Sequence, residues 1–430
     1  LGRRPNDGPT ICVKKGNTMK TKKKVLKITG IVLLTLLVLF CIASPIVVQI
    51  LMNDTFARTE PPEPGLTSSI LYEDIGRCCR SLAAMRPRAA SSPTTTSSSR
   101  ARVMPVYSTP RTPDGPARRP PGLTSSILYE DIADRYDREP VSFLSGENRL
   151  TGHLYCGDNP EGLVVISHGL GGGEESYLPE TMYFTDHGYQ VLCYSNTGCW
   201  DSEGKNCVGL NQSVLDLDAA LTWVEGESRF DGLPVFLFGH SWGGYAAAAI
   251  FHFDHDIAAS ASVAGFNEAM PMIMEWGEGM IGPLLYLEYP FIWLNQKLAF
   301  GDAFGLTAVD AINSTDTPIL ILHGSGDTTV GYNTVSIIAK KDEITNPNVR
   351  YLVCSEDRRD GHNNLLYSPA AMDYVDEVNE TGSRLDEQYD GLFHCLAVER
   401  QDAPHDPRVQ LPLAGFVDGG VVVQQNLLRN

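Results

Sequence analysis

The pentapeptide GHSWG at residues 239–243 constrains this chain most, because it joins a strand-like segment to a helix-like one. The apolar run 235–238 precedes the pentapeptide and the small-residue run 244–249 follows it. A G-x-S-x-G turn between a strand and a helix is tight, and its glycines avoid the clashes that side chains would cause. Such a turn lifts the serine oxygen above the end of the sheet. Ser241 is therefore the candidate nucleophile.

Two later segments each follow a strand-like run with a residue suited to activate a serine. The run 318–323 leads into a turn that carries Asp327, and the run 349–354 leads into a polar loop that carries His362. A histidine can take the proton of an attacking serine, and an aspartate can fix the tautomer of that histidine. The order Ser, Asp, His predicts a catalytic triad of Ser241, Asp327 and His362. The competing interpretations are an Asx turn for Asp327 and a solvated loop histidine for His362.

A glycine-rich loop at residues 168–173 follows the apolar run 163–167. Acyl transfer needs donors for the developing oxyanion, and we predict the backbone amides of Leu170 and Trp242 in that role. The loop has no G-x-G-x-x-G in register and no Gly-Lys-Ser/Thr ending, which disfavours phosphate binding. No cysteine pair has the C-x-x-C spacing of a structural zinc site. We therefore expect no cofactor and no metal.

With these motifs in order, the segment from about residue 141 to 368 resembles the α/β-hydrolase superfamily, in its esterase, lipase and serine-aminopeptidase-like branch. The resemblance rests on residues 168–169, the pentapeptide, 326–327 and 361–362. It implies a mostly parallel central sheet with helices on both faces and a serine hydrolase acting on esters, small amides or peptides. The family often has a glycine where Trp200 stands.

The alternation of apolar segments along the chain independently predicts a mostly parallel sheet with helices on both faces. We place the hydrolase domain at residues 139–390. Between the nucleophile and the acid, residues 266–300 are rich in methionine and aromatic residues and form the expected small helical cap. They are either a lid over an apolar acyl pocket or a pair of amphipathic helices that bury one face. The expected strands are 150–156, 163–167, 190–194, 235–238, 258–264, 318–323 and 349–354, and the expected helices are 175–187, 208–225 and 244–249.

Residues 28–52 contain no charged side chain and are long enough for a transmembrane helix or signal anchor. Five lysines lie in the preceding segment 1–27, between Lys20 and Lys27. This basic flank predicts a cytoplasmic N-terminal segment and a single-pass membrane protein with an extracytoplasmic hydrolase domain. A cleaved signal peptide is the alternative.

Residues 53–138 form the expected linker, and they contain a perfect repeat. The sequence PGLTSSILYEDI occurs at residues 64–75 and again at 121–132. Between the copies, residues 76–120 hold nine arginines and one acidic residue, a composition that predicts a disordered insert. The C-terminal tail, residues 391–430, shows no clear periodicity.

Charge is distributed unevenly and limits the class of substrate. Residues 1–150 hold 22 Lys and Arg against 13 Asp and Glu, so the remainder holds 12 (34−22) against 39 (52−13). The catalytic part is therefore strongly acidic, which argues against nucleic acid as a partner. The sequence favours a membrane-anchored serine hydrolase with a small ester or peptide substrate. The alternative is a catalytically inactive binding protein on the same fold, tethered to the membrane.

Overall fold

The computed structural model describes residues 16–60, 129, 132–157, 160–367 and 372–373. Within these residues, eight strands form one sheet in the order β1-β2-β4-β3-β5-β6-β7-β8. β2 is antiparallel to both of its neighbours, and the other neighbouring pairs are parallel. The strands are β1 (Arg138–Ser145), β2 (Asn148–Tyr155), β3 (Leu163–Ser167), β4 (Gln190–Tyr194), β5 (Val235–His240), β6 (Ile257–Val263), β7 (Ile319–Gly324) and β8 (Val349–Cys354).

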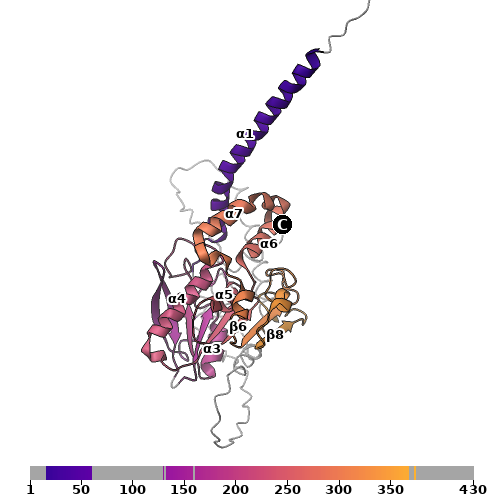
Figure 1. The fold of residues 1–430 in the computed structure, drawn as a ribbon. Coiled ribbons are helices and arrows are strands. Elements are labelled where there is room, and N and C mark those ends of the chain that lie inside the picture. Colours follow the sequence, from indigo (N-terminus) through magenta and orange to yellow (C-terminus); the bar gives the residue numbers. More distant parts are fainter. Residues whose placement is uncertain (1–15, 61–128, 130–131, 158–159, 368–371, 374–430) are drawn as a thin grey trace, which may run out of the picture.

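Helices cover both faces of this sheet, as Figure 1 shows. Side chains of β3 alternate between two buried cores: Leu163 and Val165 enter one, Val164 and Ile166 the other. This period of two explains why the central strands are apolar along their whole length, since both of their faces are covered. The helices are α1 (Gly16–Thr55), α3 (Leu178–Asp186), α4 (Gln212–Gly226), α5 (Trp242–Ala249), α6 (Ala269–Ile281), α7 (Leu285–Phe300) and α8 (Ala308–Asn313).

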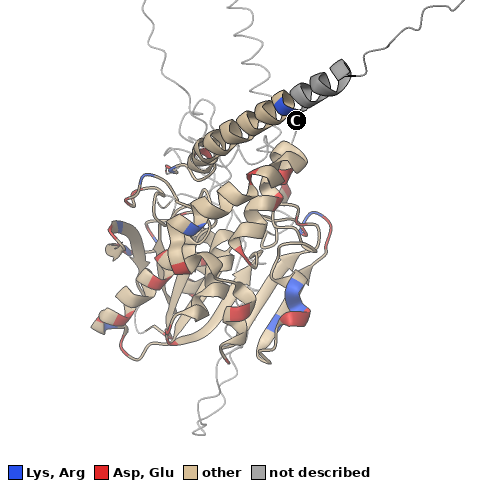
Figure 2. Ribbon diagram, turned by 45° about the horizontal axis from the view of Figure 1, so that its top comes forward, with Lys and Arg blue, Asp and Glu red and all other residues tan. Residues whose placement is uncertain are grey.

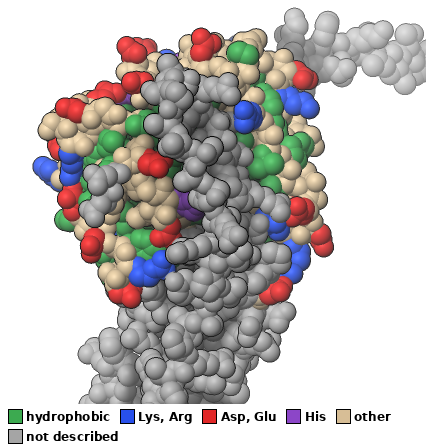
Figure 3. All heavy atoms as spheres, turned by 90° about the horizontal axis from the view of Figure 1, so that it is seen from below, with side chains coloured by type: hydrophobic (Ala, Val, Ile, Leu, Met, Phe, Trp, Pro, Cys, Tyr) green, Lys and Arg blue, Asp and Glu red, His purple; other side chains and the backbone are tan. Residues whose placement is uncertain are grey.

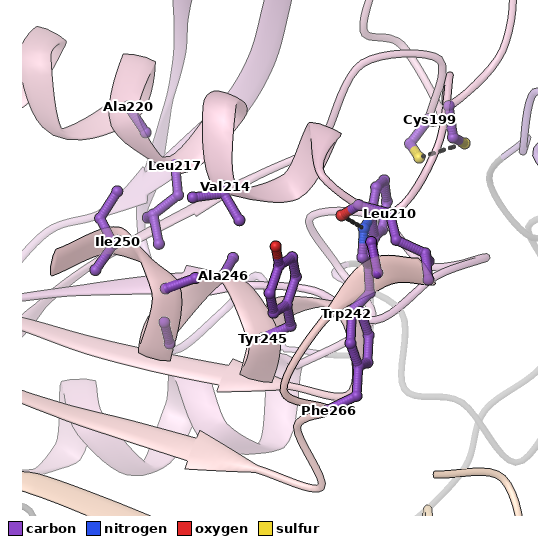
Figure 4. Close-up of a cluster of buried hydrophobic side chains, with 14 of the residues drawn as sticks. Cys199, Leu210, Val214, Leu217, Ala220, Trp242, Tyr245, Ala246, Ile250 and Phe266 are labelled. Atoms are coloured by element: carbon purple, nitrogen blue, oxygen red, sulfur yellow. Dashed lines mark hydrogen bonds between the residues drawn. The ribbon is translucent and has the colours of Figure 1, made fainter. Parts of the chain in front are cut away.

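The core shared by α4 and α5 holds α5, the helix that follows Ser241, close to the sheet (Figure 4). All four alanines at positions 246–249 are fully buried, so the backbone of α5 can approach the strands closely. Trp242 is almost fully buried, and its indole Nε1–H donates to the carbonyl of Leu210 at 2.6 Å. The beginning of α5 is therefore fixed by both packing and a hydrogen bond.

The first strand, β1, was not among the strands expected from the sequence. Its residues alternate between exposed and buried positions, and its pairing with β2 places Phe143 opposite Leu150. Just before β1, Tyr129 and Ile132 of the second repeat copy pack into the core that contains the buried side chains of α3. The first repeat copy, most of the second, the insert 76–120 and the tail 391–430 lie outside the described residues.

The segment 266–300 contains the two helices α6 and α7, joined by the short 3-10 turn Gly282–Leu284. The inner face of α6 buries Met270, Met272 and Met274 in the α4/α5 core. The cap thus lies on the same side of the sheet as α4 and α5.

Helix α1 projects away from the hydrolase domain in Figure 1. Its residues Lys27–Thr55 are long and apolar enough to cross a membrane, judged by length and composition. No charged residue lies between Lys27 and Asp54, and this stretch is tan in Figure 2. At its C-terminal end, Val48, Met52 and Phe56 are buried in the α4/α5 core. The end of α1 is therefore part of the folded domain.

Candidate active site

Ser241 lies in a strained turn between β5 and α5. Its φ of 56° and ψ of −113° fall where residues other than glycine are uncommon. Two backbone hydrogen bonds hold this conformation: the amide of Ser241 donates to Val263 at 2.8 Å, and its carbonyl accepts from Tyr245 at 3.0 Å. The turn therefore presents the serine side chain at the C-terminal edge of the parallel strands.

The two glycines of the turn are required by close backbone contacts. A Cβ atom at Gly239 would lie 2.0 Å from the carbonyl oxygen of Gly243. A Cβ atom at Gly243 would lie 1.9 Å from the carbonyl oxygen of Ser167. Both distances are far below van der Waals contact and involve backbone atoms, so no side chain fits at either position.

The structure brings Ser241, His362 and Asp327 together in one hydrogen-bonded chain. His362 Nε2 lies 2.8 Å from Ser241 Oγ, and His362 Nδ1 lies 2.7 Å from Asp327 Oδ2. All three residues are buried, with 9% or less of their surface exposed. Because the carboxylate can only accept, Nδ1 carries the proton and Nε2 presents its lone pair to the serine hydroxyl. This arrangement can remove the hydroxyl proton during an attack on a carbonyl.

Asp327 is held as a carboxylate by four neighbouring donors. Oδ1 accepts from the amides of Thr329 and Val330, and Oδ2 lies 3.1 Å from His323 Nε2 as well as near His362. Burial alone would raise the pKa of Asp327, but the hydrogen bonds from His323 and His362 hold this pKa well below its usual range. His323, at the end of β7, was not singled out from the sequence. Its side chain is fully buried and orients the acid.

A second hydrogen-bonded chain links His362 to the glycine-rich loop. His240 Nε2 lies 3.0 Å from the carbonyl oxygen of His362, and its Nδ1 lies 2.8 Å from Tyr177 Oη. The Tyr177 oxygen also accepts from the amide of Gly169 at 3.0 Å. The carbonyl of His362 requires a proton on Nε2, so Tyr177 donates to Nδ1. Desolvation, together with the nearby His362, lowers the pKa of His240 to about 3.

The sequence pattern predicts neither His240 nor Tyr177 as part of the site. Their 63-residue separation carries no local signal. A histidine beside the nucleophile was the one available hint.

The loop that contains Leu170 lies directly beside Ser241. A Cβ atom at Gly169 would lie 3.5 Å from Ser241 Cβ. His168 anchors the loop, because its Nε2 accepts from the amide of Asn196 at 2.9 Å and its Nδ1 contacts the carbonyl of Gly169 at 2.7 Å. Trp242 provides the first amide of α5, and the first four amides of an α-helix have no partner within the helix. Both proposed oxyanion donors thus belong to segments that adjoin Ser241.

Trp200 packs against this loop from the side. Its indole ring would collide with a Cβ atom at Gly173, at 2.2 Å, so the glycine makes room for the ring. The amide of Trp200 donates to Thr59, and its carbonyl accepts from the guanidinium of Arg58. Arg58 and Thr59, which follow α1, therefore hold Trp200 in place through these hydrogen bonds.

Within the described residues, no group of three or more His, Cys, Asp or Glu side chains could hold a metal ion. Cys199 and Cys207 are buried free thiols with their sulfur atoms 3.4 Å apart. They lie eight residues apart in the chain.

Comparison with known proteins finds one family model that matches part of this chain. Residues 158–302 match the family model described as serine aminopeptidase, S33. An esterase of Pyrococcus furiosus is 18% identical, with a TM-score of 0.43, over 62% of this chain and 97% of the esterase. Est1E of Butyrivibrio proteoclasticus, solved with ferulic acid, is 19% identical, with a TM-score of 0.39, over 58% of this chain and 99% of Est1E.

An acylaminoacyl peptidase of Pyrococcus horikoshii is 15% identical, with a TM-score of 0.39, over 55% of this chain and 39% of the peptidase. No curated protein matches the chain. The sheet order, the strand-turn-helix at Ser241 and the family model together confirm the expected α/β-hydrolase fold.

Proposed function

We propose that this protein is a serine hydrolase that cleaves carboxylic esters, small amides or peptides through an acyl-enzyme on Ser241. The observation that carries the proposal is the continuous hydrogen-bonded chain from Ser241 through His362 to Asp327. A serine that merely closes a turn needs neither a histidine lone pair on its hydroxyl nor a carboxylate behind that histidine. The strained φ of Ser241 adds support, because such strain concentrates at functional positions.

In the proposed reaction, Ser241 Oγ attacks the acyl carbonyl while His362 Nε2 takes its proton. The amides of Leu170 and Trp242 stabilise the negative charge on the carbonyl oxygen. His362 then donates the proton to the departing alcohol or amine, leaving the acyl group on Ser241. Water, deprotonated by the same nitrogen, releases the acid. Asp327 keeps the imidazole in the required tautomer and stabilises its cation.

We further propose that α1 is retained as a single-pass membrane anchor, with the hydrolase domain outside the cytoplasm. Cleavage as a signal peptide at a site after Phe56 would separate Val48, Met52 and Phe56 from the core in which they are buried. Burial of one such side chain is worth about 1.5–3 kcal/mol. Retention therefore preserves three core contacts that cleavage would remove.

A fluorophosphonate probe, which labels an activated serine, tests the enzymatic proposal against an inactive binding protein. We expect the wild-type protein to be labelled and Ser241→Ala to be unlabelled. Ser325→Ala, which changes an exposed serine two residues before Asp327, is the matched control and should still be labelled. An unlabelled wild-type protein would favour the inactive binding protein.

A further inference from the structure

The outer side of the cap carries an unusual concentration of exposed apolar side chains. Outside α1, twelve large hydrophobic residues of the described chain are exposed, and nine of these lie between Met280 and Leu298. Leu284 and Leu298 are 68% and 77% exposed. The opposite face of the molecule, seen in Figure 3, interleaves its hydrophobic side chains with acidic and basic ones. The cap therefore differs from the rest of the described surface.

Helix α7 is apolar on both of its sides. One side buries Leu285, Ile292 and Phe300 against the domain. Most of the other side, together with Leu284 of the preceding turn, forms an exposed stripe at helical spacing. We call it the α7 outer stripe: Leu284, Leu287, Leu294 and Leu298. A helix that is hydrophobic all round is buried in a protein or in a membrane. The inner side of α7 is covered by protein, so the outer stripe requires a second apolar environment.

The two charged residues between 280 and 299 are both engaged by nearby groups. Glu288 accepts a hydrogen bond from Ser44 Oγ of α1 at 3.1 Å, and Lys297 donates to the carbonyl of Gly301 at 2.6 Å. Tyr286, Tyr289 and Trp293 of α7 are also exposed. Tyrosine and tryptophan are enriched where a membrane meets water.

Helix α1 passes directly alongside α7. The rings of Phe40 and Phe291 meet edge to face at 5.8 Å, and Asn295 Nδ2 donates to Gln49 Oε1 at 2.9 Å. The surfaces of α1 and the α7 outer stripe are therefore continuous. A neighbouring amide cluster, in which Asn53 accepts from Gln49 and Asn206, marks the polar end of this shared surface.

The position of α7 along α1 gives the depth of α7 in a bilayer that α1 crosses. A helix rises about 1.5 Å per residue, so Phe40, thirteen residues beyond Lys27 (40−27), lies about 20 Å along the axis. Gln49, 22 residues beyond Lys27 (49−27), lies about 33 Å along it. The hydrocarbon core of a bilayer is about 30 Å thick. A core that begins at Lys27 therefore ends near the contacts between α1 and α7.

We propose that the α7 outer stripe is embedded in the boundary of the bilayer that α1 crosses, and that the substrate is an acyl ester dissolved in that bilayer. The second part rests on the proposed hydrolase function. Cap helix α6 connects the two sites: its Trp276 donates to the carbonyl of Thr329, and its Glu275 accepts from the amide of Gly331. Both partners lie in the loop of Asp327, so the cap reaches from the lipid boundary to the catalytic residues.

Quenching of tryptophan fluorescence by brominated phosphatidylcholine tests the docking surface in the full-length protein. Reconstituted wild-type protein should show quenching that Trp293→Phe largely removes. Trp223→Phe changes a tryptophan that stacks on Phe143, away from the cap, and should retain the quenching. Unchanged quenching in Trp293→Phe would overturn the proposal. Absent quenching in a protein that forms dimers would assign the stripe to a second copy and also overturn it.

A pair of substrates tests the substrate class. Leu287→Glu with Leu298→Glu should lower kcat/KM about tenfold or more for a monoacylglycerol in phosphatidylcholine vesicles, because charge weakens insertion of the stripe. Hydrolysis of water-soluble nitrophenyl acetate should remain unchanged. Leu144→Glu, at an exposed leucine of β1, is the matched control and should affect neither rate.

Equal loss for both substrates, or loss for neither, would overturn the lipid assignment. Hydrolysis of neither ester by the wild-type protein would overturn the proposed hydrolase function and with it the substrate class. The quenching experiment would still decide the docking surface, because it does not depend on catalysis.

Discussion

The edge of the sheet around Ser241 and the outer side of α7 use apolar residues in opposite ways. At the sheet edge, buried apolar side chains surround polar groups that are paired with one another, including Asp327, His362 and Tyr177. On α7, apolar side chains face outward and the charged groups are engaged by nearby partners. The first region excludes water from a set of hydrogen bonds. The second region presents apolar side chains on a surface whose charged side chains already have hydrogen-bond partners.

This difference predicts different responses to mutation. In a buried hydrogen-bonded region, removal of one partner leaves another group desolvated and unpaired, which costs about 1–3 kcal/mol. On an exposed apolar face, a substitution leaves the folded protein little affected and changes only what the face contacts. Catalysis should therefore depend on single atoms at the sheet edge, and lipid contact on the summed area of the cap.

The largest effect is expected for the base. His362→Ala should lower the turnover of a soluble nitrophenyl ester by about 10⁴–10⁶-fold, because His362 is the one proton acceptor that contacts Ser241 Oγ in the part of the chain that the structure describes. Asp327→Asn should cost about 10⁴-fold through the wrong histidine tautomer. Turnover measured with unchanged melting temperature checks this. Near wild-type turnover of His362→Ala would require a different base.

A smaller effect is expected for the chain that positions the base. Tyr177→Phe removes the donor to His240 and the acceptor for the amide of Gly169. We expect turnover to fall about 10–100-fold, corresponding to about 1.4–2.7 kcal/mol, with the fold retained. Tyr351→Phe, at an exposed tyrosine of β8, is the control and should leave turnover unchanged.

If Tyr177 positions the catalytic groups, its loss should affect soluble and lipid-borne substrates alike. The loss in Tyr177→Phe should lie in kcat for both soluble and lipid-borne esters, because the base and the oxyanion loop serve every substrate. A loss confined to the lipid-borne ester would instead link Tyr177 to the cap and contradict the positioning role.

The smallest effect is expected in the pH dependence of stability. The folded pKa of His240 is about 3, below the unfolded value of about 6.5, so the unfolded state binds more protons between these values. Stability should therefore fall as pH drops below about 6.5, by about 1.4 kcal/mol at pH 5.5 from this group. The melting temperature of His240→Gln should vary less with pH than that of the wild type. His252→Gln, at an exposed histidine, controls for loss of an imidazole. An equal pH dependence in wild type and His240→Gln would contradict the assignment.

Three residues of the candidate site could be proposed from the sequence because short segments encode them. The pentapeptide at 239–243 and the two strand-following turns specified Ser241, Asp327 and His362, since parallel strands end at the same edge of a sheet. His323 and Tyr177 could not be found in this way. Their partners lie on other elements, and a hydrogen bond across 63 residues leaves no periodic or local signal.

For the cap as well, the sequence predicted one part of the structure and contacts between distant elements decided another. Its methionine and aromatic content predicted a separate segment at 266–300, but composition alone left a lid and a buried helix pair equally open. The structure shows two helices, with methionines inward from α6 and leucines outward from α7. Which residues of an apolar helix face protein depends on contacts with other elements.

By itself, the sequence determined the α/β-hydrolase fold, the apolar helix at the N-terminal side and the candidate nucleophile, acid and base, because periodicity and turn chemistry act over a few residues. Only the tertiary structure decided that the end of α1 is buried in the hydrolase core and that α7 lies alongside α1. The contacts between α1 and α7 join segments about 240–250 residues apart, and their energy comes from side chains that meet only after the chain has folded.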